Sequence, residues 1–372
     1  MSEHAKRKRA ARRFAPVGIV FAVIGVALFV YFVRRAGVAE IMQGMRRLGA
    51  GFVLILLVSG IRPIVRSLAW TWCVEAPYTL RLRDAFVAFM TGDAVGNVVP
   101  FGVVVGEPAK AILVRERGVP LSAGVPAMAV EYLFYSLSVM ALIFAGTVAL
   151  LLSFPLPKVL RSASVGVLAG AALGAFAAFL VVRLQWKFVS RTLALLHRRG
   201  VGRRTLTAAR RERVRALEDR VYGFAARNRA RLVPLLLLES CFHLAGVVEV
   251  YITLYFISDI APTILMAFVL EAVNRVINVV FKFVPLRVGV DEAGTGMLAS
   301  ALQLGVGIGV TLAIVRKARV VVWTALGILF LVMRGLSVRA VMDEAEQSVA
   351  RAAEINQHPA EASELVEEAK TS

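Results

Sequence analysis

Residues 84–110, DAFVAFMTGDAVGNVVPFGVVVGEPAK, decide the fold of this chain, because they form an apolar stretch that polar residues, glycines and a proline interrupt. Arg81 and Arg83 precede the stretch and Arg115 follows it. Cytoplasmic flanks of membrane segments are rich in Lys and Arg, so both ends are expected on the same face of a membrane. Irregular backbone at membrane depth is tolerated only where protein or water surrounds it. We therefore predict a broken or re-entrant segment over residues 84–118.

A second stretch, predicted as a broken segment over residues 264–304, repeats this pattern. Both stretches contain Asn-Val-Val, then a proline, then Val-Gly and then a carboxylate, beginning at Asn97 and at Asn278. An apolar span precedes each stretch, and a long apolar segment with basic residues near its start follows each. The preceding spans, 50–72 and 232–257, are expected to cross in opposite directions. The sequence thus predicts an inverted repeat with discontinuous helices, which is typical of transporters.

The composition supports this assignment. The chain has 372 residues, 58% of them hydrophobic, and a formal net charge of +19; its mean hydropathy is +0.73. A water-facing globule of this size cannot bury so much apolar surface. The composition predicts an all-α polytopic membrane protein and excludes a disordered chain, a fibrous repeat and a disulfide-rich domain. About six full spans are expected in addition to the two broken segments: 17–33, 50–72, 121–152, 163–182, 232–257 and 306–333.

The charges divide the chain into five parts. These are a basic N-terminus (1–16), a first membrane half (17–182), a basic loop (183–231), a second membrane half (232–335) and an acidic tail (336–372). The basic loop has a net charge of +12. The positive-inside rule predicts a multi-pass membrane protein with both termini in the cytoplasm. The membrane is expected to be a bacterial-type cytoplasmic (inner) membrane. The basic loop could bind anionic lipid headgroups or be a solvated linker. Nucleic-acid binding is not expected, because no aromatic-interleaved motif accompanies the charge.

Several charged residues fall inside the predicted spans. Arg62 and Arg66 either face protein, water or a headgroup, or extend toward a membrane interface marked by nearby tryptophans. Glu239 and His243 are four residues apart, which favours an intrahelical hydrogen bond over a metal site, since a metal needs a third ligand. No metal, no cofactor and no catalytic set is expected.

The same residues carry a resemblance to a known family. The chain resembles the flippase-like transmembrane region of lysylphosphatidylglycerol synthases over roughly residues 15–335. The first signature comprises Gly96 to Pro100, Gly106 to Ala111, Leu113, Arg115 and Glu131; the second comprises Glu271 to Arg275, Val284-Pro285, Gly289, Glu292 to Gly294 and Arg316. Two features depart from the family: Lys110 replaces the usual arginine, and Leu286 to Val288 stand where glycines are common.

The resemblance implies that the protein translocates or presents a lipid across the bilayer. The soluble aminoacyl-transferase domain of full-length synthases has no counterpart in this sequence, so lysyl-lipid synthesis is not expected. Stand-alone relatives are associated with hopanoid synthesis and glycolipid assembly, and the cargo is expected to have an anionic or polar headgroup. Expected partners are membrane lipid and lipid-synthesis enzymes. The alternatives are a membrane-embedded enzyme that acts on a lipid-linked substrate and a non-catalytic scaffold of a lipid-synthesis complex.

Nine residues are candidates for lipid or substrate binding. The basic ones can hold a phosphate or another anionic headgroup. The carboxylates beside the breaks could instead stabilise helix starts, Arg275 could form a helical ion pair with Glu271, and the asparagines could satisfy broken backbone. The candidates are Asn97, Glu107, Lys110, Arg115, Glu131, Arg275, Asn278, Glu292 and Arg316.

Overall fold

The computed structural model describes residues 30–31, 33–34, 38–98, 103–183, 192, 208–281 and 287–333, and these residues contain helices and no strands. The expected all-α class is confirmed. Eleven helices are named as follows: α2 (Val38–Leu48), α3 (Gly51–Cys73), α4 (Leu82–Val98), α5 (Val103–Arg115), α6 (Leu121–Ser153), α7 (Lys158–Arg183), α9 (Ala208–Arg227), α10 (Arg229–Ile257), α11 (Ile264–Val280), α12 (Val290–Ala301) and α13 (Val306–Met333).

Within the described part of the chain, four helices are long and apolar enough to cross a membrane: α3, α6, residues Lys158–Ala177 of α7, and α10. They coincide with four of the expected spans. The expected sixth span forms the 28-residue helix α13, which carries three basic residues near its middle. Most of the expected first span, the basic N-terminus, the first part of the basic loop and the acidic tail lie outside the described residues.

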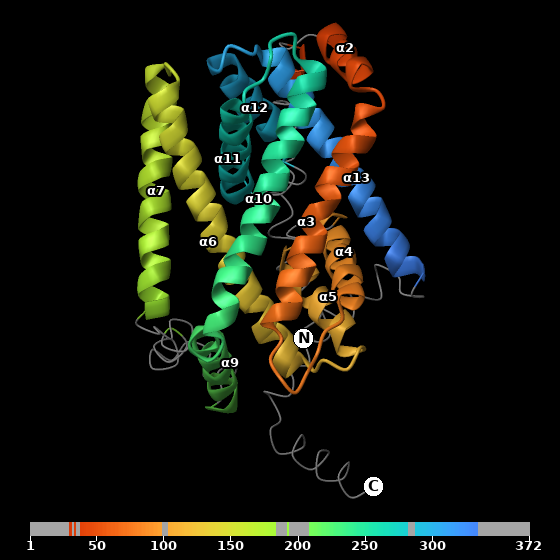
Figure 1. Ribbon diagram of the computed structural model, residues 1–372, viewed down its shortest axis with the longest axis vertical. Helices are drawn as coiled ribbons and strands as arrows, with labels where there is room; N and C mark the ends of the chain where they lie inside the picture. Colours follow the sequence, from red (N-terminus) through yellow and green to blue (C-terminus); the bar gives the residue numbers. More distant parts are fainter. Residues whose placement is uncertain are drawn as a thin grey trace, which may run out of the picture.

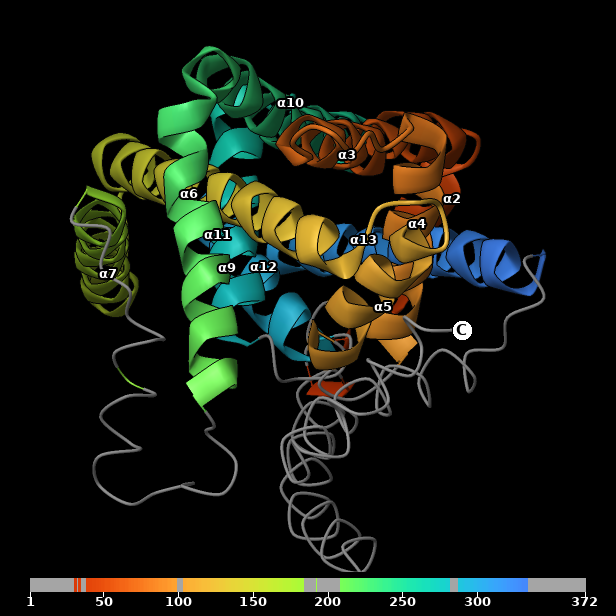
Figure 2. The same cartoon turned by 90° about the horizontal axis from the view of Figure 1, so that it is seen from below.

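The helix α6 is longer than a membrane requires. Its 33 residues rise 1.5 Å each and so reach about 50 Å, against a hydrocarbon core of about 30 Å. The helix therefore has to tilt, and Figure 1 shows it crossing the bundle obliquely. Helix α7 returns beside α6 at the edge of the bundle (Figure 2). Only 6% of the 18-residue apolar stretch within Lys158–Ala177 of α7 is buried inside the bundle. Most of the surface of this stretch is therefore free to contact lipid.

Each of the two interrupted segments consists of two short helices that pack on each other, α4 with α5 and α11 with α12. The joining residues 99–102 and 282–286 lie outside the described part of the chain. In Figure 1 the α4–α5 pair occupies the lower half of the molecule and the α11–α12 pair the upper half. The long helices α3 and α10 run antiparallel beside each other along one face of the bundle (Figure 2) and make the most extensive helix contact. Helix α4 packs on α13, and α11 packs on α6.

Glycine allows two of these contacts to be very close. A β-carbon on Gly106 of α5 would lie 2.7 Å from the carbonyl oxygen of Gly92 on α4. A β-carbon on Gly327 of α13 would overlap the carbonyl oxygen of Met90 on α4. Small residues let membrane helices approach backbone to backbone, and here they hold α4 between α5 and α13.

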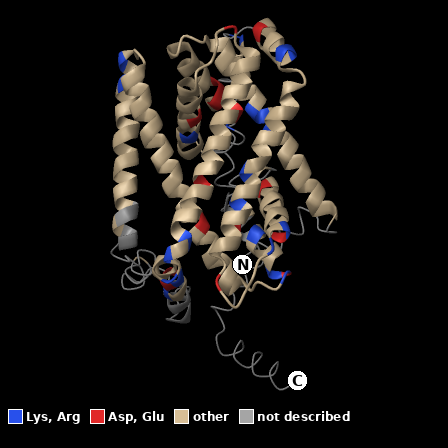
Figure 3. Ribbon diagram, in the orientation of Figure 1, with Lys and Arg blue, Asp and Glu red and all other residues tan. Residues whose placement is uncertain are grey.

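The two larger apolar clusters of the described core lie toward opposite ends of the bundle. One includes Ile55 of α3 and Val247 of α10, and the other includes Ala69 of α3 and Leu235 of α10. Arg62 and Arg66 of α3 and Glu239 of α10 fall between these positions in the sequence, and Glu249 lies two residues beyond Val247. Figure 3 shows basic and acidic residues inside the middle of the bundle as well as at its ends. A charged layer therefore separates the two apolar clusters.

Candidate functional site

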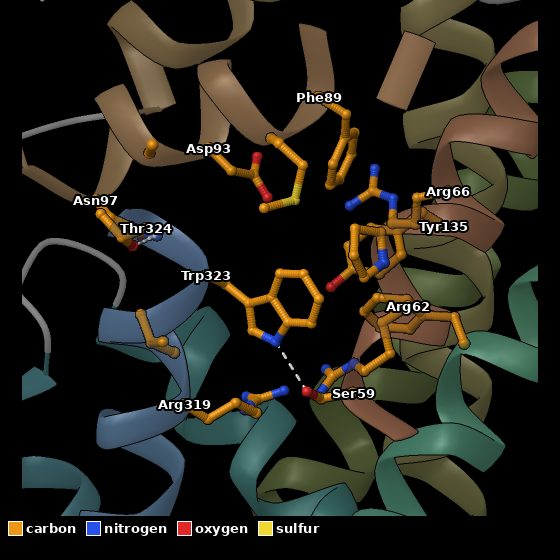
Figure 4. A pocket seen from close by; sticks show the side chains of 15 residues that line it. Ser59, Arg62, Arg66, Phe89, Asp93, Asn97, Tyr135, Arg319, Trp323 and Thr324 are labelled. Atoms are coloured by element: carbon orange, nitrogen blue, oxygen red, sulfur yellow. Dashed lines mark hydrogen bonds between the residues drawn. The ribbon is translucent and has the colours of Figure 1, made fainter. Parts of the chain in front are cut away.

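A cavity of about 230 Å³ opens within this charged layer, between α3, α4, α6, α10 and α13. Figure 4 shows the side chains of Arg62, Arg66, Asp93 and Arg319 around it, with the indole of Trp323 among them. The indole nitrogen of Trp323 donates a hydrogen bond to the Ser59 hydroxyl, 2.8 Å away, which ties α13 to α3. The wall is thus mixed: aromatic rings alternate with guanidinium groups and one carboxylate.

Four arginines beside the cavity share two glutamates, and we call this group the arginine cluster. Glu249 lies 3.3 Å from Arg62 and 2.9 Å from Arg319. Glu271 accepts a short hydrogen bond from Arg275, and it lies 3.5 Å from Arg316 and 3.8 Å from Arg62. The six side chains, contributed by α3, α10, α11 and α13, are Arg62, Glu249, Glu271, Arg275, Arg316 and Arg319.

The arginine cluster has more positive than negative charge. Four guanidinium groups face two carboxylates, which leaves a net charge of +2 within these six residues. Nitrogen atoms of Arg275, Arg316 and Arg319 lack a hydrogen-bond partner among the described residues. The ring of Phe242 lies 4.5 Å from Arg62 and 5.1 Å from Arg275, and stabilises the cations without neutralising them. Buried charges are normally paired, so the cluster is suited to receive an anion.

Arg66 forms a separate pair with Glu131. Two of its nitrogens lie 2.5 and 2.8 Å from the two carboxylate oxygens, and its guanidinium lies 3.9 Å from the ring centroid of Tyr135. Both Arg62 and Arg66 are buried. The interpretation that they face protein is therefore confirmed, and the alternative of extension toward an interface is wrong.

At each of the two helix pairs, a lysine lies between carboxylates. On the first pair, Lys110 lies 2.7 Å from Asp93 and 3.1 Å from Glu107. On the second, Lys317 of the adjoining α13 lies 2.7 Å from Glu292. Glu292 also accepts a hydrogen bond from the backbone N–H of Gly289, 2.7 Å away, at the start of α12. The helix-start interpretation is confirmed for Glu292, which pairs with a lysine in addition.

The nine predicted site residues are only partly brought together. Asn97 lines the cavity and donates a hydrogen bond to Thr324, 3.1 Å away. Arg275 and Arg316 belong to the arginine cluster, Glu131 holds Arg66, and Glu107 and Lys110 bond to each other. Glu292 lies with Lys317, Arg115 is exposed at the end of α5, and half-buried Asn278 is not among the residues that line the cavity. The predicted ion pair between Glu271 and Arg275 is confirmed.

Sequence reasoning missed several residues of the site. Glu249 and Trp323 contribute to it, and only the unusual charge of Glu249 within an apolar span could have indicated this. Arg319, by contrast, is expected from its charge to bind an anionic headgroup, and it does line the cavity. Tyr135 and Phe242 also line the cavity, but aromatic residues are common in membrane helices and gave no signal. Tyr135 lies against Arg66 and Phe242 lies against Arg62. These contacts join different helices, so the sequence alone does not show them.

The expected hydrogen bond between Glu239 and His243 is wrong. The Nε2 atom of His243 lies 3.0 Å from the Ser138 hydroxyl, and both carboxylate oxygens of Glu239 lack a hydrogen-bond partner among the described residues. The two side chains share a face of α10 but turn to different neighbours. Within the described ranges no group of His, Cys, Asp and Glu is arranged to hold a metal ion.

Comparison with known proteins gives one finding. The family model described as "Lysylphosphatidylglycerol synthase TM region" matches residues 17–327, which is most of the chain. Neither the curated proteins nor the solved structures contain a significant match.

Proposed function

Because the chain belongs to the lysylphosphatidylglycerol synthase TM-region family, a family of membrane proteins connected with lipid handling, we propose that it translocates or presents a lipid with an anionic headgroup across the bilayer. The observation that carries the proposal is the uncompensated positive charge of the arginine cluster beside a cavity. A phosphate or carboxylate would accept charge-assisted hydrogen bonds from guanidinium nitrogens that lack a hydrogen-bond partner among the described residues, such as Nε of the cavity-lining Arg319.

The size of the cavity supports a headgroup as the ligand rather than a whole lipid. A volume of about 230 Å³ is below the roughly 300–1,000 Å³ of typical small-molecule pockets. Acyl chains would therefore stay among the membrane lipids while the headgroup enters the bundle. The aromatic rings of Trp323 and Tyr135 would exclude water from the headgroup and so strengthen its contacts with the arginines.

Alternating access through an inverted repeat is the mechanism we propose. Its support is the exchange of contacts between the two halves: α4 of the first half packs on α13 of the second, and α11 of the second half packs on α6 of the first. The antiparallel pair α3 and α10 packs on α4 and α11. The two helix pairs occupy opposite ends of the bundle, so movement of each could open the cavity to a different side. The basic helix α9 lies at the same end as α4 and α5. The positive-inside rule favours this end as cytoplasmic, in a bacterial-type inner membrane with both termini in the cytoplasm.

The test is lipid movement in reconstituted vesicles. The variant Arg319→Gln removes one cation that lines the cavity and leaves Glu249 paired with Arg62, so the fold should be retained. Loss of a charge-assisted hydrogen bond worth about 1.5–3 kcal/mol should slow the movement of a labelled anionic phospholipid at least about tenfold. The control is Arg161→Gln on the exposed surface of α7, which should move lipid like the wild type. Equal rates in empty, wild-type and Arg319→Gln vesicles would contradict the proposal.

The same vesicles separate transport from enzymatic action. We propose that the protein is not an enzyme, so mass spectrometry should find the labelled lipid chemically unchanged after it has moved. A new lipid species that forms with purified protein would instead support a membrane-embedded enzyme. A scaffold would give neither movement nor product, and would tolerate Arg319→Gln in the cell.

A further inference from the structure

Glu239 is a buried acid that the arginine cluster does not use. It lies on α10 with an exposed fraction of 0%, and neither carboxylate oxygen has a hydrogen-bond partner among the described residues. An ionised carboxylate in such a position loses several kcal/mol of hydration without compensation, whereas a protonated acid is neutral. The position therefore suits a group that holds a proton until its surroundings change.

Two helices packed against α10 bring charges close to Glu239. Arg66 of α3 would attract a negative charge on Glu239, and Glu131 of α6 would repel it. Arg66 is already engaged, because it donates two hydrogen bonds to the carboxylate of Glu131. While Glu131 holds Arg66, Glu239 has no cation of its own, and the neutral acid is the stable form.

His243 lies one turn further along α10, behind the aromatic wall of the cavity. Its ring stacks on Tyr135 with 6.2 Å between centroids and meets Phe242 edge-on at 5.2 Å. The Nε2 atom faces the Ser138 hydroxyl, and Nδ1 has no hydrogen-bond partner among the described residues. A neutral imidazole can take up a proton at one nitrogen and release one from the other. The charged groups that act on this ring are Arg62, Arg66, Glu271 and Arg275.

We propose that Glu239, assisted by His243, is a proton-binding site whose occupancy is coupled to headgroup binding through Arg66. The inference rests on the proposed function, since it supplies the driving force for movement of the lipid. Arg66 lines the cavity, so an anionic headgroup would compete with Glu131 for its guanidinium. Deprotonated Glu239 would be a third competitor for the same cation.

One guanidinium cannot neutralise three anions, and this sets the sign of the coupling. Headgroup binding strengthens proton binding by Glu239, and release of the headgroup weakens it. By linkage, protonation must tighten headgroup binding by the same factor. Proton and anionic lipid should therefore move in the same direction, and lipid should accumulate in the leaflet that faces the less acidic compartment.

The first experiment tests the proton site without any lipid movement. Infrared spectra of the protein in nanodiscs at neutral pH should contain a carboxylic-acid carbonyl band that Glu239→Gln removes. Glu75→Gln should keep the band, because Glu75 is an ion-paired carboxylate outside the spans. Gln has the size of the neutral acid, so Glu239→Gln should unfold at the same temperature as the wild type. Identical wild-type and Glu239→Gln spectra would overturn the proposal.

The second experiment tests the coupling. With a difference of one pH unit across the vesicle membrane, coupling to one proton supports up to a roughly tenfold lipid asymmetry in the wild type. Glu239→Gln should still move lipid but reach an equal distribution. His243→Gln should keep the infrared band and approach the asymmetric distribution more slowly.

The outcomes separate this inference from the proposed function. Wild-type vesicles that move lipid to an equal distribution despite the gradient would overturn the coupling and leave lipid movement standing. Absence of lipid movement in all vesicles would overturn the proposed function, and with it the coupling, while the infrared result would still decide whether Glu239 holds a proton.

Discussion

Arg66 depends on two neighbours of different chemistry, the carboxylate of Glu131 and the ring of Tyr135. Both contacts are short, and the Arg66 side chain is only 11% exposed. A buried pair of this kind adds little net stability compared with apolar residues, because both ions lose their hydration. Removal of one partner is costly, because the other charge then stays buried alone. The pair therefore constrains the arrangement of α3 and α6 more than it stabilises the fold.

This asymmetry gives a prediction for Arg66→Met. The single variant strands Glu131 and should lower the free energy of unfolding by about 3–5 kcal/mol, whereas the double variant Arg66→Met/Glu131→Gln should regain most of that loss. Thermal unfolding in detergent measures both, with Arg161→Gln as the surface control. A double variant no more stable than the single one would show that the stranded charge is not the cause.

Among the helices, the fit between α4 and α13 is very sensitive to side-chain size. Gly327 of α13 meets the backbone of α4 at Met90, and α4 supplies the cavity residues Asp93 and Asn97. A methyl group at Gly327 would have to push α4 away, because the obstructing atoms belong to the backbone and cannot rotate aside.

Gly327→Ala should therefore separate α4 from α13. Overpacking of this kind typically costs about 1–3 kcal/mol, and the expected signs are a lower unfolding temperature and faster hydrogen exchange in α4. Gly166→Ala on α7 is the matched control, because no atom lies within 4 Å of a β-carbon there. Equal unfolding temperatures for the two variants would show that the close contact is not structurally important.

The apolar runs predicted the helices well, because a run of about 20 apolar residues is nearly sufficient to specify a spanning helix. Glycine and proline likewise indicated the two interruptions. The partners of the buried charges were not predictable. Glu249 meets Arg62 and Arg319 from two other helices, and sequence spacing carries no information about such contacts. The four-residue spacing of Glu239 and His243 wrongly predicted a hydrogen bond between them, because two side chains on one helix face need not turn toward each other.

At the scale of the whole molecule, each helix pair packs on a long helix of the other half, α4 on α13 and α11 on α6. This exchange of contacts predicts that a movement of one half is accompanied by a movement of the other. If each helix pair moves against the long helix on which it packs, a covalent link between α4 and α13 would fix the cavity in one state. Asn97 and Thr324 are suited to this link, because their side chains bond across the interface at 3.1 Å.

The variant Asn97→Cys/Thr324→Cys, with exposed Cys241 changed to serine, should move lipid when reduced and stop when oxidised. Recovery after reduction is the control for damage. The single variant Asn97→Cys should be unaffected by the oxidant. Lipid movement at an equal rate in the oxidised and reduced double variant would contradict alternating access between these helices.

The excess charge of the arginine cluster has an electrical consequence. An elementary charge that crosses a potential of 100 mV changes in free energy by about 2.3 kcal/mol, and a charge that crosses part of the field changes in proportion. The empty cluster carries two uncompensated positive charges, so a membrane voltage would bias the position of the unloaded protein. A headgroup with two negative charges would cancel this dependence. The voltage would then affect the step in which the empty protein returns. The step in which the protein carries the lipid would move no net charge.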